Sequence, residues 1–329
     1  MLFNILTFNH GDRYIAIERM DPIVRWTKEV ISKCGHEVII GYNEIYPGAI
    51  QLLFENFPST IPVGNGGFIS WNKVFESLKN QHKVQVGVIA TELIIDGIIP
   101  YATDSMTRID VSDRVKGFHL AIERADFTWC FLERTANSYK KEDNLIKFLP
   151  VGSLGVIPKE SRRSPKDIDI LFFGKATPHR VSAIKKFADA GLHVFTLGVG
   201  WREGSFSAPA YLASMIDRSK IILNLTLSES TQSSSSPDAR FASCMRIVEI
   251  LSRGGLIASE RIPQDNPYDR FMISAAIEDL PRICKAILQD DSWRNLGEKL
   301  SDLFDKEMNA EQLCKPVIDQ TLLALGHSN

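Results

Sequence analysis

Short, continuous apolar runs alternate with stretches of helical periodicity along this chain, and that alternation limits its fold more than any other feature. In the second half, strands are predicted at Ile168–Phe173, His193–Gly198, Ile221–Leu227 and Leu256–Ser259. Helices are predicted between them at Val181–Ala190, Pro209–Lys220 and Ala239–Arg253. Fully apolar strands separated by helices of about 10–15 residues are typical of parallel sheets covered on both faces. The second half therefore predicts a doubly wound α/β domain.

The first half shows the same alternation. Its predicted strands are Phe3–Phe8, Glu37–Tyr42, Val84–Thr91, Phe127–Leu132 and Ile146–Val151, and its predicted helices are Tyr14–Cys34, Phe68–Lys79 and Ser112–Arg124. The stretch Val151–Asp167 mixes glycine and proline with cations, which is typical of a domain boundary. We therefore expect an α/β chain with two doubly wound Rossmann-like domains facing a cleft, at residues 1–155 and 165–308. The tail is helical, and we expect its last helix, 309–329, to pack back on the first domain.

Composition narrows the range of functions. The chain has 38 Lys and Arg against 40 Asp and Glu, so it lacks the basic excess of a nucleic-acid-binding protein. Its five cysteines form no CxxC pair, which argues against a structural zinc site or a disulfide framework. The N-terminus resembles a first strand more than a signal peptide, and no apolar run approaches the ~18 residues of a transmembrane helix. We expect a cytoplasmic protein with no nucleic-acid partner.

The first candidate site is the segment from Leu171 to Arg180, where a predicted strand runs into a short polar turn. Thr177 and the proline after it form a good N-cap and first residue for the next helix. Gly174 lets a ligand approach the backbone, and a helix N-terminus favours an anion. Lys175 and Arg180 add positive charge. The alternative is a tight turn with incidental surface cations.

The second candidate site lies on the predicted helix that precedes Gly254. Arg246, Glu249 and Arg253 are spaced at i, i+3 and i+7, on one face of that helix. In a nucleotide site, Glu249 accepts hydrogen bonds from ribose hydroxyls, and Arg246 contacts phosphate. The alternative is an exposed ladder of ion pairs, with Glu249 and Arg253 in the favourable i,i+4 order.

Three segments in this order, 167–180 (DIDILFFGKATPHR), 211–225 (YLASMIDRSKIILNL) and 246–260 (RIVEILSRGGLIASE), resemble the GT-B glycosyltransferases. The resemblance is to the spore-maturation-protein-like group with a group-1-type C-terminal domain. It implies an enzyme of glycan or glycoconjugate biosynthesis that moves a hexosyl or related sugar from a nucleotide-diphosphate donor, UDP- or dTDP-linked, to an acceptor hydroxyl. It implies the following donor-binding residues: Gly174, Lys175, Thr177, Arg180, Gly198, Asn224, Arg246 and Glu249. The Ser-rich stretch 228–236 departs from the family pattern.

Candidate catalytic residues lie in the first half. His10 and Asp12 follow the first predicted strand, and Glu92 follows a strongly apolar one. A carboxylate at a strand end can have its pKa raised by burial and can act as a general base on an acceptor hydroxyl. The alternative for Asp12 is a helix N-cap beside a partly exposed histidine. Asp104 and Glu133 are weaker candidates of the same kind.

Metal and cofactor dependence are not expected. The pair Asp167 and Asp169 resembles an Asp-x-Asp metal motif, but it stands at the start of a strand, whereas nucleotide sites lie at strand ends.

The partners expected are a nucleotide-sugar and a glycan or small-molecule acceptor, with peripheral membrane association left open for a lipid-linked acceptor. Two alternatives remain at this point. One is a transferase with a cytidine-monophosphate donor, or another nucleotide-sugar enzyme on the same fold, and the other is a non-catalytic binding module.

Overall fold

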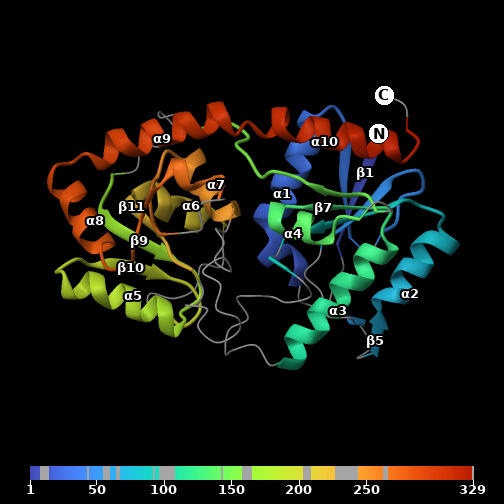
Figure 1. The fold of residues 1–329 in the computed structure, drawn as a ribbon, viewed down its shortest axis with the longest axis horizontal. Coiled ribbons are helices and arrows are strands. Elements are labelled where there is room, and N and C mark those ends of the chain that lie inside the picture. The colour runs from blue at the N-terminus through green and yellow to red at the C-terminus, as the bar shows by residue number, and fades with distance from the viewer. Residues whose placement is uncertain are drawn as a thin grey trace. The chain divides into compact units, whose positions relative to one another are not determined.

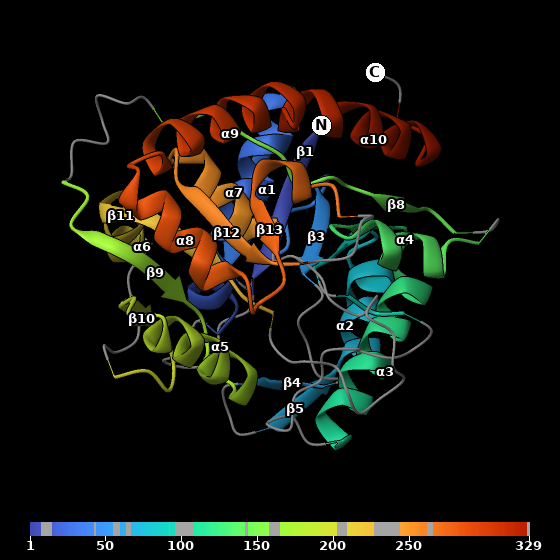
Figure 2. The ribbon, with the colours of Figure 1, turned by 60° about the vertical axis from the view of Figure 1, so that its left-hand side comes forward.

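The structure, a computed structural model, describes residues 1–7, 15–42, 44–54, 60–63, 67–91, 93–95, 108–141, 144–157, 165–202, 209–226, 244–261 and 266–327. The chain divides into two compact units (Figures 1 and 2). Unit 1 is Met1–Leu154 together with Ala310–Asn329, and unit 2 is Gly155–Asn309. Each unit is described by itself.

Unit 1 is built on a sheet of parallel strands in the order β2-β1-β3-β6-β7-β8. These strands are β1 (Leu2–Thr7), β2 (Glu37–Tyr42), β3 (Ile50–Phe54), β6 (Val86–Ala90), β7 (Phe127–Cys130) and β8 (Ile146–Phe148). Its helices are α1 (Ile15–Lys33), α2 (Trp71–Glu76) with the π-helical turn η1 (Ser77–Gln81), α3 (Arg108–Arg124), α4 (Glu133–Tyr139) and α10 (Ala310–Ala324). A separate antiparallel hairpin pairs β4 (Thr60–Val63) with β5 (Gly67–Ser70). Every residue of β3, β6 and β7 is buried, so side chains on both faces of the sheet are covered.

The last helix, α10, is part of the core of unit 1. It packs against α1, and the backbone N–H of Ala310 donates to the carbonyl of Ser153 at 2.8 Å. On β7, the indole Nε1–H of Trp129 donates to Thr321 Oγ1 at 3.0 Å, and both side chains are fully buried. The hydroxyl of Thr321 in turn donates to the carbonyl of Val317 at 2.7 Å. A buried indole N–H needs such an acceptor, so this bond fixes the register of α10 on the sheet.

Replacing Thr321 with valine tests the contribution of this bond. Valine keeps the shape of threonine but leaves the N–H of Trp129 buried without its acceptor, which costs about 1–3 kcal/mol. We expect the free energy of unfolding of unit 1, followed by tryptophan fluorescence in urea, to fall by that amount. Thr321→Ser keeps the hydroxyl and is the control. A Thr321→Val variant that is as stable as the wild type would mean that the hydrogen bond contributes nothing.

Unit 2 is built on a second parallel sheet with the order β10-β9-β11-β12-β13. Its strands are β9 (Ile168–Phe173), β10 (Val194–Leu197), β11 (Ser219–Asn224), β12 (Leu256–Glu260) and β13 (Ile273–Ala275). Its helices are α5 (Pro178–Asp189), α6 (Pro209–Arg218), α7 (Cys244–Ser252), α8 (Leu280–Gln289) and α9 (Trp293–Glu307), with a 3₁₀ turn η4 (Asp269–Phe271).

Both faces of the second sheet are buried. Ile170 and Phe172 of β9 join a core with Phe187 of α5 and Trp293 of α9. The alternate residues of the same strand point to the opposite face, and Leu171 is likewise fully buried there. The prediction of an α/β chain with two doubly wound Rossmann-like sheets is therefore confirmed. No helix among the described residues is long and apolar enough to cross a membrane.

Several short elements differ from the prediction. The helix expected at Phe68–Lys79 begins only at Trp71, because Gly67–Ser70 pairs with Thr60–Val63 as β5. Phe68 and Ile69 are residue types that favour a strand. The strands β3 and β13 and the helix α4 were not predicted, since runs of three to seven residues give too little periodicity to separate from loops.

Candidate functional site

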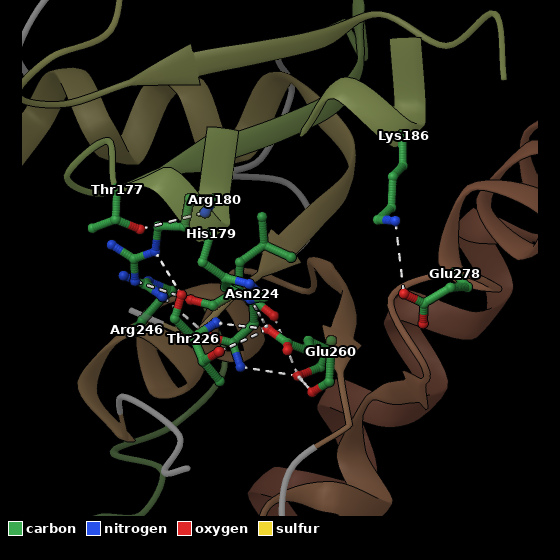
Figure 3. Close-up of polar contacts among 11 residues, drawn as sticks. Thr177, His179, Arg180, Lys186, Asn224, Thr226, Arg246, Glu260 and Glu278 are labelled. Carbon is green, nitrogen blue, oxygen red and sulfur yellow. Dashed lines mark hydrogen bonds and ion pairs between the residues drawn. The ribbon is translucent and has the colours of Figure 1, made fainter. Parts of the chain in front are cut away.

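The candidate site lies at one edge of the sheet of unit 2. Because the strands are parallel, the carboxyl ends of β9, β11 and β12 lie at this edge, together with the first turns of the helices α5 and α7. Figure 3 shows the polar side chains that these elements bring together, which are Thr177, His179, Arg180, Asn224, Thr226, Arg246 and Glu260. They are separated by up to 83 residues in sequence, and the sheet topology alone makes them neighbours.

The turn from β9 into α5 has the predicted geometry. Thr177 is the N-cap of α5, its side chain accepts a hydrogen bond from the backbone N–H of Arg180 at 3.3 Å, and Pro178 opens the helix. Gly174 has φ +149°, a conformation that favours glycine. Its N–H donates to the carbonyl of Leu197 at 2.8 Å, and its own carbonyl accepts from the indole N–H of Trp201 at 2.8 Å. The turn is therefore held against the loop that follows β10.

Gly198 begins that loop, and it lies so close to Gly174 that no side chain fits at position 198. A Cβ on Gly198 would overlap the carbonyl oxygen of Gly174, and its φ of +128° is also unfavourable for other residues. The predicted site residues Gly174 and Gly198 thus lie in direct contact, so the turns after β9 and β10 form one unit.

Gly198→Ala should disrupt this unit. Gly191, at the end of α5, has φ +75° and open space around it, so Gly191→Ala is a matched control that carries only the backbone strain. We expect Gly191→Ala to lower the free energy of unfolding of unit 2 by about 1–2 kcal/mol. Gly198→Ala adds the steric overlap and should cost at least about 3 kcal/mol. Chemical denaturation of both variants measures this, and equal losses would contradict the contact described above.

Arg180 connects the turn after β9 to the end of β11. Its side chain is almost fully buried and lies over the ring of Phe172, with 5.3 Å from Cζ to the ring centroid. Its guanidinium donates to three backbone carbonyls, those of Lys175 at 3.1 Å, Leu225 at 2.9 Å and Thr226 at 3.0 Å. Three bonds in fixed directions position this guanidinium without any carboxylate.

Arg246 approaches the same place from the first turn of α7. Its Nη1 donates to Oδ1 of Asn224 at 3.1 Å, and its Cζ lies 5.3 Å from the ring centroid of Phe173. Asn224 is oriented in turn by Ser259, whose Oγ accepts from Asn224 Nδ2 at 3.0 Å. The Nε of Arg246 is inaccessible to solvent and has no acceptor among the described residues. An orphaned buried donor of this kind marks a place where an acceptor fits.

The two guanidiniums meet above Gly174. The point that a Cβ on Gly174 would occupy lies 3.2 Å from Nη1 of Arg180 and 3.2 Å from Nη2 of Arg246. Burial and then the charge of Arg246 lower the pKa of Arg180 to about 9, and burial lowers the pKa of Arg246 to about 10. Both shifts mean that the cationic forms are destabilised by desolvation, and an anion would relieve that cost. We call Arg180 and Arg246, with Gly174 beneath them, the two-arginine cluster.

Two residues beside this cluster, Glu260 and His179, were not predicted. Glu260 ends β12 and is 2% exposed. Its Oε2 accepts hydrogen bonds from the N–H of Thr226 at 3.1 Å and from the hydroxyl of Thr226 at 2.8 Å, and it lies 2.9 Å from Nε2 of His179. Burial raises the pKa of Glu260, but its hydrogen bonds from His179 and Thr226 outweigh burial and hold that pKa below its usual value. A carboxylate at the end of an apolar strand is the signal in the sequence that could have identified Glu260.

The remaining predicted donor residues lie differently. Lys175 is exposed, and its contribution to the cluster is its carbonyl, which holds Arg180. Glu249 lies one turn farther along α7 than Arg246. Its Oε1 accepts from Nε of Arg253 at 2.9 Å, and Nη1 of Arg253 also bonds Asp217 of α6 at 3.0 Å. The Glu249–Arg253 ion pair considered from the sequence is therefore present, whereas Arg246 bonds Asn224. The ribose-binding role of Glu249 stays a prediction.

The candidate catalytic residues His10, Asp12 and Glu92 lie outside the described residues. The Asp-x-Asp pair lies at the amino end of β9, as expected. Asp167 pairs with Arg218, and Asp169 pairs with Lys220 at 2.7 Å. Both carboxylates are thus engaged by cations, at the opposite end of this strand from the two-arginine cluster.

Comparison with known proteins identifies the fold. No family model matches the chain, and no curated protein matches it in sequence. Among solved structures, the chain is similar to WaaG, a glycosyltransferase involved in lipopolysaccharide biosynthesis, with a TM-score of 0.54 and 13% identity over 99% of this chain and 100% of that one. It is similar to AviGT4, a glycosyltransferase involved in avilamycin A biosynthesis, with a TM-score of 0.52 and 13% identity over 99% of both chains. The chain is also similar to TarM, with a TM-score of 0.54 and 11% identity. That match covers 85% of this chain and 55% of the length of TarM.

These neighbours have the fold expected from the sequence. The chain has two parallel-sheet, Rossmann-like units like those of the GT-B glycosyltransferases. Identities of 11–13% show a shared fold and no more. Membership of the spore-maturation-protein-like group stays a prediction, since no family model matches.

Proposed function

We propose that this protein is a glycosyltransferase that moves a sugar from a nucleoside-diphosphate donor to an acceptor hydroxyl. The observation that carries the proposal is the two-arginine cluster at the carboxyl edge of the second sheet. Two desolvated guanidiniums converge above a glycine there, beside the first turn of α5. Ligands of doubly wound sheets bind at this edge, and a diphosphate has the charge and the acceptors that the cluster lacks. The glycosyltransferases among the structural neighbours support the same class of activity.

The chemistry follows from where charge develops. When the bond between the anomeric carbon and the diphosphate breaks, negative charge grows on the leaving oxygen. Arg180 and Arg246 are held in place before the reaction, so they stabilise that charge without reorganising. The N-terminus of α5 adds the partial positive charge of the helix dipole. We propose that these groups do the work that a divalent metal ion does in other transferases, so that the reaction needs no metal.

The other predicted residues complete the donor site in this proposal. Asn224 orients Arg246, the turn at Gly198 lies against the base, and Glu249 holds the ribose. Unit 2 then binds a UDP- or dTDP-linked sugar, and unit 1 binds the acceptor, a glycan or a small molecule. Glu92, Asp12 and His10 are the candidates for the base that deprotonates the acceptor. A reaction that inverts the configuration at the anomeric carbon requires such a base. A reaction that retains the configuration would need none of these three residues as a base.

Arg246→Gln tests the proposal most directly. Glutamine keeps a polar amide but removes the charge, and a bond to a charged group contributes about 1.5–3 kcal/mol. We expect the variant to bind UDP or dTDP about 10- to 100-fold more weakly by calorimetry, and to lose transfer in proportion. Without ligand, the variant should be as stable as the wild type or more so, because a desolvated charge is gone.

Arg282→Gln is the control, since Arg282 is a largely exposed arginine on α8 of the same unit. A ligand panel separates the alternatives. A diphosphate at ~100 times its dissociation constant should stabilise the wild type by about 2.7 kcal/mol in a thermal-shift assay. Stabilisation by cytidine monophosphate alone would favour the monophosphate donor. Stabilisation without donor hydrolysis or transfer would favour a non-catalytic binding module, and no stabilisation by any nucleotide would refute the proposal.

Glu249→Ala separates the two interpretations of that residue. If Glu249 binds ribose, the variant loses most of its affinity for UDP but keeps its affinity for inorganic pyrophosphate, which has no ribose. If Glu249 serves only its ion pair with Arg253, both affinities stay and only the free energy of unfolding falls, by about 0.3–0.5 kcal/mol. Titration calorimetry with the two ligands distinguishes these results. We expect the first.

A further inference from the structure

Glu260 is a buried carboxylate to which the proposed function assigns no role. It ends β12, is 2% exposed and directs Oε2 at Thr226 and His179. A carboxylate at this depth is costly unless its charge interacts with an opposite charge. Two partners of Oε2, the N–H and the hydroxyl of Thr226, are neutral dipoles, and the third is the ring nitrogen of His179.

Glu260 also lies near one member of the two-arginine cluster, Arg180. Thr226, which Glu260 holds by two hydrogen bonds, offers its own carbonyl to Arg180 at 3.0 Å, so the carboxylate and this guanidinium flank a single residue. The field of Glu260 raises the pKa of Arg180, against the larger effects of burial and of Arg246, which lower it. Arg180 directs its donors to three backbone carbonyls, and Arg246 directs Nη1 to Asn224. The carboxylate therefore acts on the cluster through space.

We infer that Glu260 is an internal counter-ion of the two-arginine cluster, which stabilises the empty site and lowers its affinity for diphosphate. The inference rests on the proposed function, because it requires that the cluster bind a diphosphate. Without ligand, the negative charge of Glu260 offsets part of the repulsion between the positive charges of Arg180 and Arg246. An incoming diphosphate supplies its own negative charge and is repelled by Glu260. The same residue therefore favours the folded protein and weakens the bound complex, which allows the nucleotide to leave after transfer.

His179 is a titratable group in contact with Glu260. Its ring nitrogen lies 2.9 Å from Oε2, so its protonation state bears on the charge of the pair. The wild type and the variants are therefore compared at one fixed pH, pH 8. The carboxylate is the only negative charge that the variant below removes.

Glu260→Gln tests the inference at pH 8. Glutamine keeps an oxygen for the N–H and hydroxyl of Thr226 but removes the charge. We expect a lower melting temperature than the wild type without ligand, and about tenfold tighter binding of inorganic pyrophosphate and of UDP by calorimetry. A purely structural role would weaken folding and binding together. Glu278→Gln is the matched control, because Glu278 is a largely exposed carboxylate of the same unit, paired with Lys186 at 3.7 Å, and it should change neither quantity.

A double-mutant cycle with Arg246→Gln supplies the second test. If the two charges balance each other, Glu260→Gln destabilises the protein less when Arg246 is also glutamine, and the double variant folds even if the single variant does not. Weaker or unchanged pyrophosphate binding by Glu260→Gln, additive stability losses, or a double variant that also fails to fold would overturn the inference. A wild type that binds neither UDP nor pyrophosphate would instead refute the proposed function, whatever the variants show.

Discussion

The candidate site depends on the desolvation of two arginines at the ends of parallel strands. A hydrated guanidinium gains little free energy by binding an anion. A guanidinium that has lost its hydration gains more, because the anion replaces the interactions that water supplied. Arg180 is buried by the core of unit 2 and held by three carbonyls, so it cannot swing out to solvent when no ligand is present. Arg246 is placed beside it, and its Nε has no acceptor in the part of the chain that the structure describes. The fold thus supplies, before any ligand arrives, a positive charge that is fixed in position.

Most of the fold was predictable, because most of its strands are continuous apolar runs that are buried on both sides. The strands β9, β11 and β12 begin and end within a few residues of their predicted bounds, since a fully buried parallel strand is a continuous apolar run. The N-cap at Thr177 was also predictable, because capping depends on residues only three positions apart. The segment Gly67–Ser70 was not, because its state is decided by a partner strand and not by its own sequence.

The site was predicted less completely, for a related reason. The turn at Gly174 and the helix carrying Arg246 are local patterns, and each pointed to phosphate separately. Glu260 and His179 lie 81 residues apart, and nothing near either one in the sequence indicates the other. Gly198 was predicted from the family resemblance, but the reason for the glycine is its contact with Gly174, which only the paired turns after β9 and β10 create. Sequence patterns identify such residues individually, whereas the topology of the sheet determines which of them meet.

That topology also explains why position 180 carries arginine. Its three carbonyl partners come from two places, Lys175 in the turn before α5 and the pair Leu225 and Thr226 after β11. Their directions match the planar fork of a guanidinium, whereas a lysine ammonium is a single point at the end of a flexible chain. A lysine there would supply the charge but would leave two of the three carbonyls without a donor. In the proposed function, the residue that presents positive charge to a ligand is thus also the one that joins the ends of β9 and β11.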